Sequence, residues 1–158
     1  MVSPLSWAPV AVIALGIGDR PVVALVAATT VWPILASTAE GVASVDPGHA
    51  LVARALGASP AERWRTVTVP AVRPRVLSGV RMAIGIGWVV LVPAEMLGVT
   101  SGLGYQILNA KDQLAYHQIT ALILVIGTIG YAVDVLARWA LRTPRERAEA
   151  RQPTTRLQ

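Results

Sequence analysis

A polar segment, residues 46–81, separates two long hydrophobic stretches of this chain. It carries six arginines and two helix-start signals, whereas the stretches on either side are nearly free of charge. Hydrophobic residues make up 54% of the 158 residues and charged residues only 15%, against about 25% charged residues in an ordinary soluble domain. This balance favours a membrane protein. We interpret the polar segment as a surface that meets a partner next to the membrane.

The positive charges gather in two places. Arginines crowd the polar segment and the C-terminal tail, and only Arg20 and Lys111 lie elsewhere. Basic residues in short loops next to apolar spans mark the cytoplasmic side of a membrane. A soluble basic surface would scatter these charges, so the net charge of +5 does not indicate a nucleic-acid partner. Both basic regions are therefore predicted to face the cytoplasm.

Four hydrophobic stretches approach the roughly 20 residues that a helix needs to cross a hydrocarbon core about 30 Å thick. They are Leu5–Ile17, Pro21–Thr38, Met82–Val99 and Ile119–Ala137. The first is the shortest and contains Pro9. The sequence thus predicts an all-α, polytopic transmembrane bundle of about four spans.

Three glycines lie around the start of the third stretch. Gly79, Gly85 and Gly87 are small enough to let two membrane helices approach closely. We expect ordinary helix packing there rather than a ligand site.

The first half of the polar segment carries the start and stop signals of a short helix. Asp46 is a good N-cap, and Pro47 occupies the first helical position, where its missing N–H costs nothing. We predict that this helix runs to about Leu56, with Gly57 as the left-handed residue that stops it.

A second helix is predicted directly after the first. Ser59 and Glu62 are three residues apart and form a capping box. We predict that Pro70 ends this helix and that Pro74 keeps the chain extended before the next span. The segment is then a helix, a tight turn and a second helix held against a membrane.

Three interpretations of this helical hairpin can be weighed. It docks onto a partner, it is a solvated amphipathic connector, or it is a DNA-binding helix-turn-helix. A plain connector could be far shorter, and a hairpin whose two ends re-enter the bilayer cannot easily reach a major groove. Docking onto a partner is the interpretation that we favour, because it accounts for the length of this segment.

The residues from Gly57 to Pro70 resemble the cytoplasmic signature loop of ABC importer permeases. That loop has the pattern Glu-Ala-Ala, three residues, Gly, nine residues, Ile, one residue, Leu-Pro. Gly57, Val67, Val69 and Pro70 fall at those spacings, and Ala53 matches the last residue of the opening triplet.

The first two positions of that triplet differ, since they hold Leu51 and Val52. This departure is common in the branch for nitrate, sulfonate, taurine and related substrates, which the chain most resembles. Further motifs shared with that branch are A-R-A-L-G-A-S, V-P-A-V-R-P-R-V-L-S-G-V-R, A-E-M-L-G-V and G-L-G-Y. The similarity covers nearly all of residues 4–142.

The resemblance implies the permease subunit of an ATP-driven importer for a small anionic solute, in a bacterial inner membrane. ATP hydrolysis would occur on a separate ATPase subunit, so the chain itself would be no enzyme and would hold no cofactor. Its other implied partners are a periplasmic or lipoprotein substrate-binding protein, a second permease copy and membrane lipid. Residues 1–142 would form a permease domain that lacks the first spans, and residues 143–158 a polar tail. The alternative is a truncated remnant or accessory protein that keeps the fold but does not transport.

By the same resemblance, the hairpin is the coupling helix that sits in a groove of the ATPase. The residues expected to dock or couple are Ala53, Arg54, Gly57, Ala58, Ser59, Glu62, Trp64, Val67 and Pro70.

A second group of candidates lies near the predicted outer end of the third span. Glu95 is the carboxylate nearest to membrane depth, and ionisable residues there are functional candidates because burying them costs about 3 kcal/mol. Equally, Glu95 could cap the polar helix predicted at Gly104–Gln113, or simply reach the lipid headgroups. Gly102 and Gly104 are expected to allow a sharp turn, and Asn109 could meet an anion or simply face solvent.

A membrane-embedded enzyme is the remaining alternative. Intramembrane hydrolysis needs a nucleophile beside a base. His49 and His117 are the two histidines and lie in loops predicted on opposite sides of the membrane, and the chain has no G-x-S-x-G motif. The sequence also has no cysteine and no histidine pair with metal-ligand spacing, so we predict neither a catalytic nor a metal site.

Overall fold

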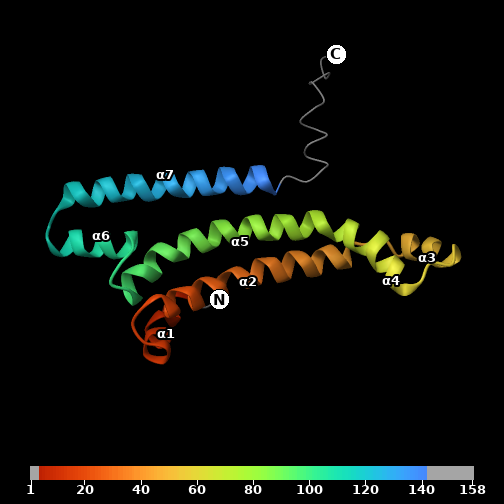
Figure 1. Ribbon diagram of the computed structural model, residues 1–158, viewed down its shortest axis with the longest axis horizontal. Helices are drawn as coiled ribbons and strands as arrows, with labels where there is room; N and C mark the ends of the chain where they lie inside the picture. Colours follow the sequence, from red (N-terminus) through yellow and green to blue (C-terminus); the bar gives the residue numbers. More distant parts are fainter. Residues whose placement is uncertain (1–3, 142–158) are drawn as a thin grey trace, which may run out of the picture.

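The computed structural model describes residues 4–141, and every element in that range is helical. The elements are η1 (Pro4–Trp7), α1 (Ala8–Leu15), α2 (Asp19–Ala43), α3 (Pro47–Ala55), α4 (Pro60–Arg63), the π turn η2 (Trp64–Thr68), α5 (Val69–Gly98), α6 (Leu103–Asp112) and α7 (Tyr116–Ala140). α2, α5 and α7 run alongside one another, with α3 and α4 beyond one end and α1 and α6 at the opposite end (Figure 1). The predicted all-α fold is confirmed. The predicted tail, residues 143–158, lies outside the described residues.

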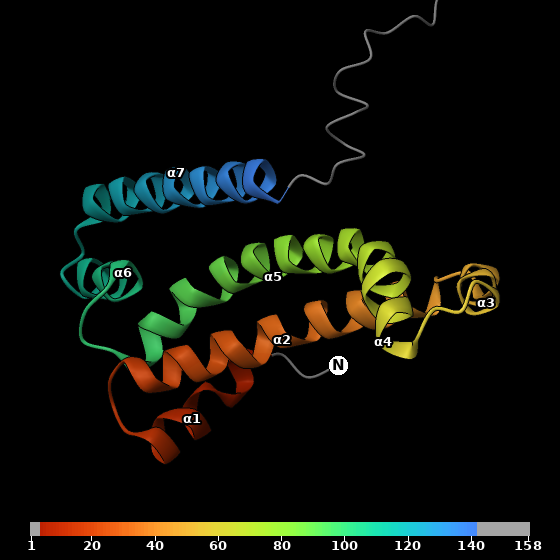
Figure 2. The same cartoon turned by 45° about the vertical axis from the view of Figure 1, so that its right-hand side comes forward.

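Three helical stretches within residues 4–141 are long and apolar enough to cross a membrane: α2, Pro60–Gly98 and α7. The prediction of a further span at Leu5–Ile17 is wrong. The apolar helix there covers only Pro4–Leu15, about 18 Å at 1.5 Å per residue, and it stops before Gly16, which has a φ of +81°. α1 instead folds back beside α2 at the end that carries α6 (Figure 2).

The chain stays helical through Pro70 and Pro74, which corrects two predictions. α4, η2 and α5 form one helical stretch of 39 residues. In η2 the N–H of Val69 donates to the carbonyl of Trp64, five residues back. This wider turn gives the Pro70 ring room that an ordinary α turn would deny it. Pro74 lies inside α5, where it removes one backbone donor without ending the helix.

α2 and α5 pack against each other more extensively than any other two helices of the described chain. A Cβ added at Gly79 would stand only 2.7 Å from the Cβ of Ser37, and one at Gly87 would stand 3.0 Å from Cγ2 of Thr30. The predicted close approach of helices is thus confirmed at Gly79 and Gly87. It is wrong for Gly85, where an added Cβ would meet nothing within 4 Å. We call this contact the α2–α5 seam.

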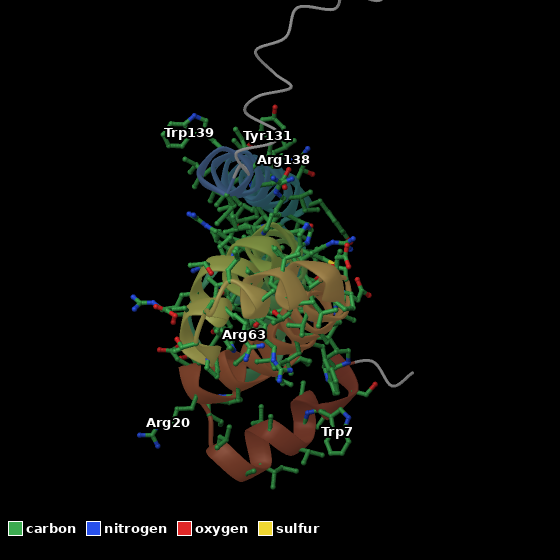
Figure 3. All side chains as sticks on the ribbon, turned by 90° about the vertical axis from the view of Figure 1, so that its right-hand side faces the viewer. Trp7, Arg20, Arg63, Tyr131, Arg138 and Trp139 are labelled. Carbon is green, nitrogen blue, oxygen red and sulfur yellow. The ribbon has the colours of Figure 1, made fainter. Side chains whose placement is uncertain are left out.

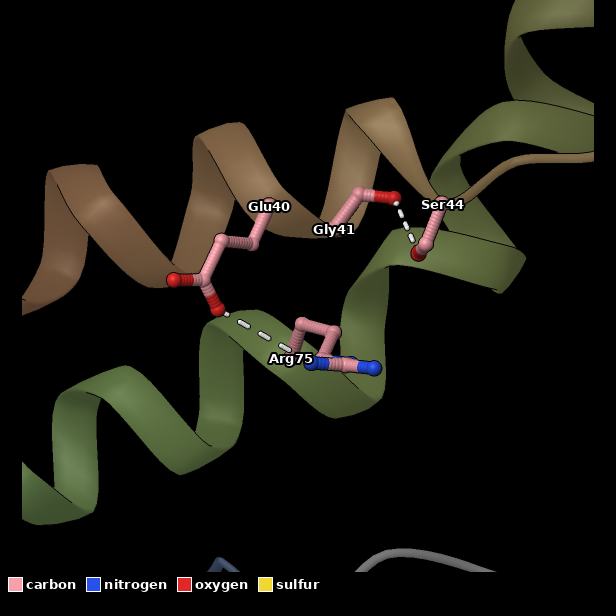
Figure 4. A network of polar contacts seen from close by, with 4 residues as sticks. All are labelled: Glu40, Gly41, Ser44 and Arg75. Atoms are coloured by element: carbon pink, nitrogen blue, oxygen red, sulfur yellow. Dashed lines mark hydrogen bonds and ion pairs between the residues drawn. The ribbon is translucent and has the colours of Figure 1, made fainter.

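Polar groups surround the end of the seam nearest α3 (Figure 4). Nη1 of Arg75 lies 3.9 Å from Oε2 of Glu40, with both side chains largely exposed, and the Ser44 hydroxyl donates to the Gly41 carbonyl at 2.9 Å. A Cβ added at Gly41 would stand 3.0 Å from the Cβ of Arg75. Because an exposed ion pair contributes at most about 1 kcal/mol, close packing rather than charge holds this end together.

The buried core lies at the opposite end, where α1, α2 and α5 meet. Its buried members are Ala8, Val22, Leu25, Ala94 and Val99. The N–H of Gly18 donates to the carbonyl of Gly98 at 2.9 Å, which ties the beginning of α2 to the last residue of α5. The seam is therefore fastened at both ends.

α7 packs far more loosely on its neighbours. It approaches α5 at Gly130, where an added Cβ would collide with the Trp88 ring. Most of its side chains are exposed, and Tyr131 and Trp139 point away from the other helices (Figure 3).

A small charge cluster lies near the last turns of α7. Asp134 and Arg138 form an ion pair one turn apart, and Arg81 of α5 interacts electrostatically with Asp134. The ion pair itself lies within α7.

Candidate functional site

α3 begins and ends where its local sequence predicts. The Asp46 carboxylate accepts a hydrogen bond of 2.8 Å from the N–H of Gly48, which satisfies one of the free donors of the first turn. At the other end the N–H of Ala58 donates to Ala53 and that of Gly57 donates to Arg54, both at 3.0 Å. This pair of bonds, with a φ of +83° at Gly57, is a Schellman motif.

α4 begins with the predicted capping box. The N–H of Glu62 donates to the Ser59 hydroxyl at 3.3 Å, and the N–H of Ser59 donates to the Glu62 carboxylate at 2.8 Å. Four residues therefore separate α3 from α4, and each helix is closed by its own hydrogen bonds. We call Pro47–Thr68 the hairpin; it projects beyond the end of the α2–α5 seam (Figure 1).

The nine predicted coupling residues do not share one face of the hairpin. Ala53, Val67 and Pro70 line a groove of about 560 Å³ between α3 and η2. By contrast, Arg54 and Glu62 are exposed on the outside. The first group thus faces the space between the two arms, and the second faces outward.

Three exposed apolar side chains of α3 were not among the predicted coupling residues. Leu51, Val52 and Leu56 are all exposed, Leu56 to 83%. Val52 and Leu56 are four residues apart and so share a face of the helix. The sequence shows that spacing, although Leu51 and Val52 also stand where the signature triplet has Glu and Ala.

Trp64 occupies the junction between the hairpin and the seam. It lines an apolar groove of about 350 Å³ together with residues of α2 and α5, among them Val42 and Val72. Its side chain is nevertheless exposed to 60%. Trp64 is thus placed where the hairpin and the membrane helices meet.

At the opposite end, the structure joins three of the four predicted path residues. Oε2 of Glu95 accepts a hydrogen bond of 2.8 Å from the N–H of Gly104, in the first turn of α6. A Cβ added at Gly102 would stand 2.6 Å from the same oxygen. Asn109 lies apart from them, exposed, and its Oδ1 accepts a hydrogen bond of 3.1 Å from the Gln113 side chain.

Within residues 4–141, no group of three or more His, Asp or Glu side chains could hold a metal ion. The hydrogen bonds described above are those of helix caps and of contacts between helices.

Comparison with known protein families places these features in context. Residues 1–145 match the model of the family described as the binding-protein-dependent transport system inner membrane component. The chain belongs to this family. Three apolar helices of membrane-spanning length suit a multi-pass member of it.

Similar curated proteins are named as permeases of several transport systems. The bicarbonate transport system permease protein CmpB of Synechococcus elongatus is 34% identical over 144 residues, 90% of this chain and 51% of that protein. The nitrate import permease protein NrtB of the same species is 31% identical, over 89% of this chain and 52% of the relative. The taurine transport system permease protein TauC of Escherichia coli is 35% identical, over 85% and 49%. The chain thus spans about half the length of these relatives.

Proposed function

We propose that this chain is the permease subunit of an ATP-driven importer and that an ATPase subunit docks on the hairpin. The observation that carries this proposal is the continuous helix from α4 through η2 into α5. A displacement of the hairpin reaches the membrane helix without crossing a flexible loop. Since the seam joins α5 to α2, both spans would move together and switch access from one side of the membrane to the other.

The exposed side chains of the hairpin suit a protein partner. Val52, Leu56 and Trp64 present apolar area, and Arg54 lies beside them in the chain. Tryptophan and arginine are enriched among the residues that dominate binding energy at protein interfaces. The arginine pattern supports a cytoplasmic location for the hairpin and for the C-terminal end of α7.

The solute is proposed to be small and anionic. The relatives are named as permeases for bicarbonate, nitrate and taurine, and each of these solutes carries a negatively charged group. The description of the family supports a separate substrate-binding protein as a further partner, and a second permease copy would complete the path. The exposed amide of Asn109 on α6 is a candidate contact for the solute at the far end of that path.

Cross-linking tests the docking surface. The chain lacks cysteine, so Ala58→Cys and Glu62→Cys each introduce a unique thiol on the hairpin. In membranes that contain the ATPase subunit, we expect both to cross-link to it, with a yield that changes when ATP is added. Gln106→Cys, exposed on α6 at the opposite end, is the matched control and should give no such product. Equal yields from all three positions would contradict the proposal.

A substitution at Gly57 tests whether the hairpin transmits motion. An added Cβ there would meet nothing within 4 Å, but the φ of +83° is unfavourable for a side chain, by about 1–2 kcal/mol. We expect Gly57→Val to lower transport relative to ATP hydrolysis and Gly57→Asn, which tolerates this conformation, to retain coupling. If both variants coupled normally, the hairpin geometry would not matter to transport.

A further inference from the structure

The first turn of α6 has no capping side chain of its own. Its N-cap is Gly102, which leaves the backbone donors of that turn without a local acceptor. Glu95 supplies the acceptor from the end of α5, nine residues earlier, through the bond from its carboxylate to the N–H of Gly104. The negative charge also lies at the positive end of the α6 dipole.

Two glycines bring α6 close enough for this bond. A Cβ added at Gly104 would collide with the backbone carbonyl of Val92, and one added at Gly102 would collide with the Glu95 carboxylate. The obstacle at Gly104 is backbone, which cannot swing aside as a flexible side chain can. The first turn of α6 is therefore seated on α5 by shape as well as by the hydrogen bond.

α6 in turn holds the beginning of α7. It lies between α5 and α7 (Figures 1 and 2), and only three residues, 113–115, separate the two helices. Ala110 of α6 is 3% exposed, so α6 has a buried face within this part of the fold. Because α7 itself packs only loosely on α5, the placement of α6 largely decides where α7 begins.

We propose that Glu95 is a positioning residue that clamps α6 onto α5 and thereby sets the position of α7. Its carboxylate acts as a hydrogen-bond acceptor inside the protein and not as a group that meets the solute. The consequence for transport rests on the proposed permease function, whereas the clamp itself does not.

The clamp can be tested by thiol labelling, which needs no transport. Ala110→Cys places a unique thiol at a buried position of α6 in the cysteine-free chain. A water-soluble maleimide is applied to the full chain in lipid nanodiscs, and the labelling rate is measured. Gln106→Cys on the exposed face of α6 reports the rate for an accessible thiol.

With Ala110→Cys as background, Glu95→Ala should speed labelling by about tenfold, the scale of one lost charge-assisted hydrogen bond. Glu95→Gln keeps an acceptor oxygen and should stay within about twofold of the parent. Gly104→Ala leaves the carboxylate intact but pushes α6 off Val92, and it should label about as fast as Glu95→Ala. Circular dichroism then verifies that each variant remains helical.

Slow labelling in both Glu95→Ala and Gly104→Ala would overturn the clamp. Labelling of Glu95→Gln as fast as that of Glu95→Ala would show that an acceptor oxygen at this position does not hold α6, and would overturn the hydrogen-bonded clamp as well. Where transport is measurable, Glu95→Gln should exceed Glu95→Ala by about tenfold. Loss of transport in Glu95→Gln with Ala110→Cys still protected would instead identify Glu95 as a group that meets the solute.

A chain without transport activity would contradict the proposed function, but the labelling rates would still test the clamp.

Discussion

The α2–α5 seam and α7 are two kinds of helix contact within one small protein. In the seam, helix backbones approach until glycines such as Gly79 are the only residues that fit. α7 meets α5 where its Gly130 lies against the Trp88 ring, and most of its side chains are exposed.

The difference between these two contacts indicates which part of the molecule is the more rigid. Without a hydrophobic driving force between helices in lipid, close backbone packing supplies much of the attraction, so the seam should behave as one body. α7, held through side chains and through α6, should be easier to displace. The following predictions test this contrast.

Gly79→Leu should cause the largest loss. Its Cβ would press on Ser37 and on the carbonyl of Pro33, and we expect the free energy of unfolding to fall by about 3 kcal/mol, the upper range for overpacking. Titration with a denaturing detergent, followed by circular dichroism, measures it. Gly85→Leu on the same helix enters open space and is the matched control, with an expected loss below about 1 kcal/mol. Equal losses would remove the distinction between packed and open faces.

Gly130→Leu should have a smaller effect, because the obstacle is the Trp88 side chain rather than a backbone. We expect a loss of about 2 kcal/mol. Adding Trp88→Ala should recover at least about 1 kcal/mol of it in a double-mutant cycle, since the two residues are in contact. If the two changes in the free energy of unfolding were strictly additive, α7 would not be held by its contact with Trp88.

Gly87→Ala probes the seam more gently. The new methyl would stand 3.0 Å from Cγ2 of Thr30, and we expect a loss of about 1 kcal/mol. Thr30→Ser removes that Cγ2 while keeping the hydroxyl, which donates to the Val26 carbonyl at 2.8 Å. The double variant should therefore regain the parent's free energy of unfolding. If Thr30→Ser gave no rescue, the seam would be less tight than the geometry indicates.

Asp134→Asn and Glu40→Gln should change stability least. Each removes one partner of an ion pair whose side chains are largely or partly exposed, and such pairs contribute about 0–1 kcal/mol. We expect losses below about 0.5 kcal/mol for both in the same detergent titration. A loss above about 2 kcal/mol for Asp134→Asn alone would mean that charge rather than packing holds α7.

The features predicted correctly from sequence are the ones decided within a few residues. The Asp46 cap, the Gly57 stop and the Ser59–Glu62 capping box depend only on the side chains at those positions and on adjacent backbone. Each forms the same hydrogen bonds wherever the rest of the chain lies. This is why the beginning and end of α3 and the beginning of α4 could be predicted from the sequence.

The features that were missed depend on distant parts or on small backbone adjustments. Whether Pro70 ends a helix depends on whether the preceding turn can widen, and no residue type signals that. Glu95 left three alternatives open because the N–H that it binds, that of Gly104, becomes a neighbour only after the chain turns back. The contact between Glu95 and Gly104 could therefore not be decided from the sequence, and the exposed apolar side chains of Leu51, Val52 and Leu56 were not predicted as part of the docking surface.

The π turn also separates the register of the chain from the direction of the helix. Successive residues of an α-helix are rotated by about 100° around its axis, but a π turn holds one residue more than the α turn that it replaces. Removing a single residue from Trp64–Thr68 would therefore restore an ordinary α turn and leave the direction of α3 and α4 relative to α5 nearly unchanged. The deletion would instead remove the space around the Pro70 ring, so the extra residue accommodates that proline and does not set the orientation of the hairpin.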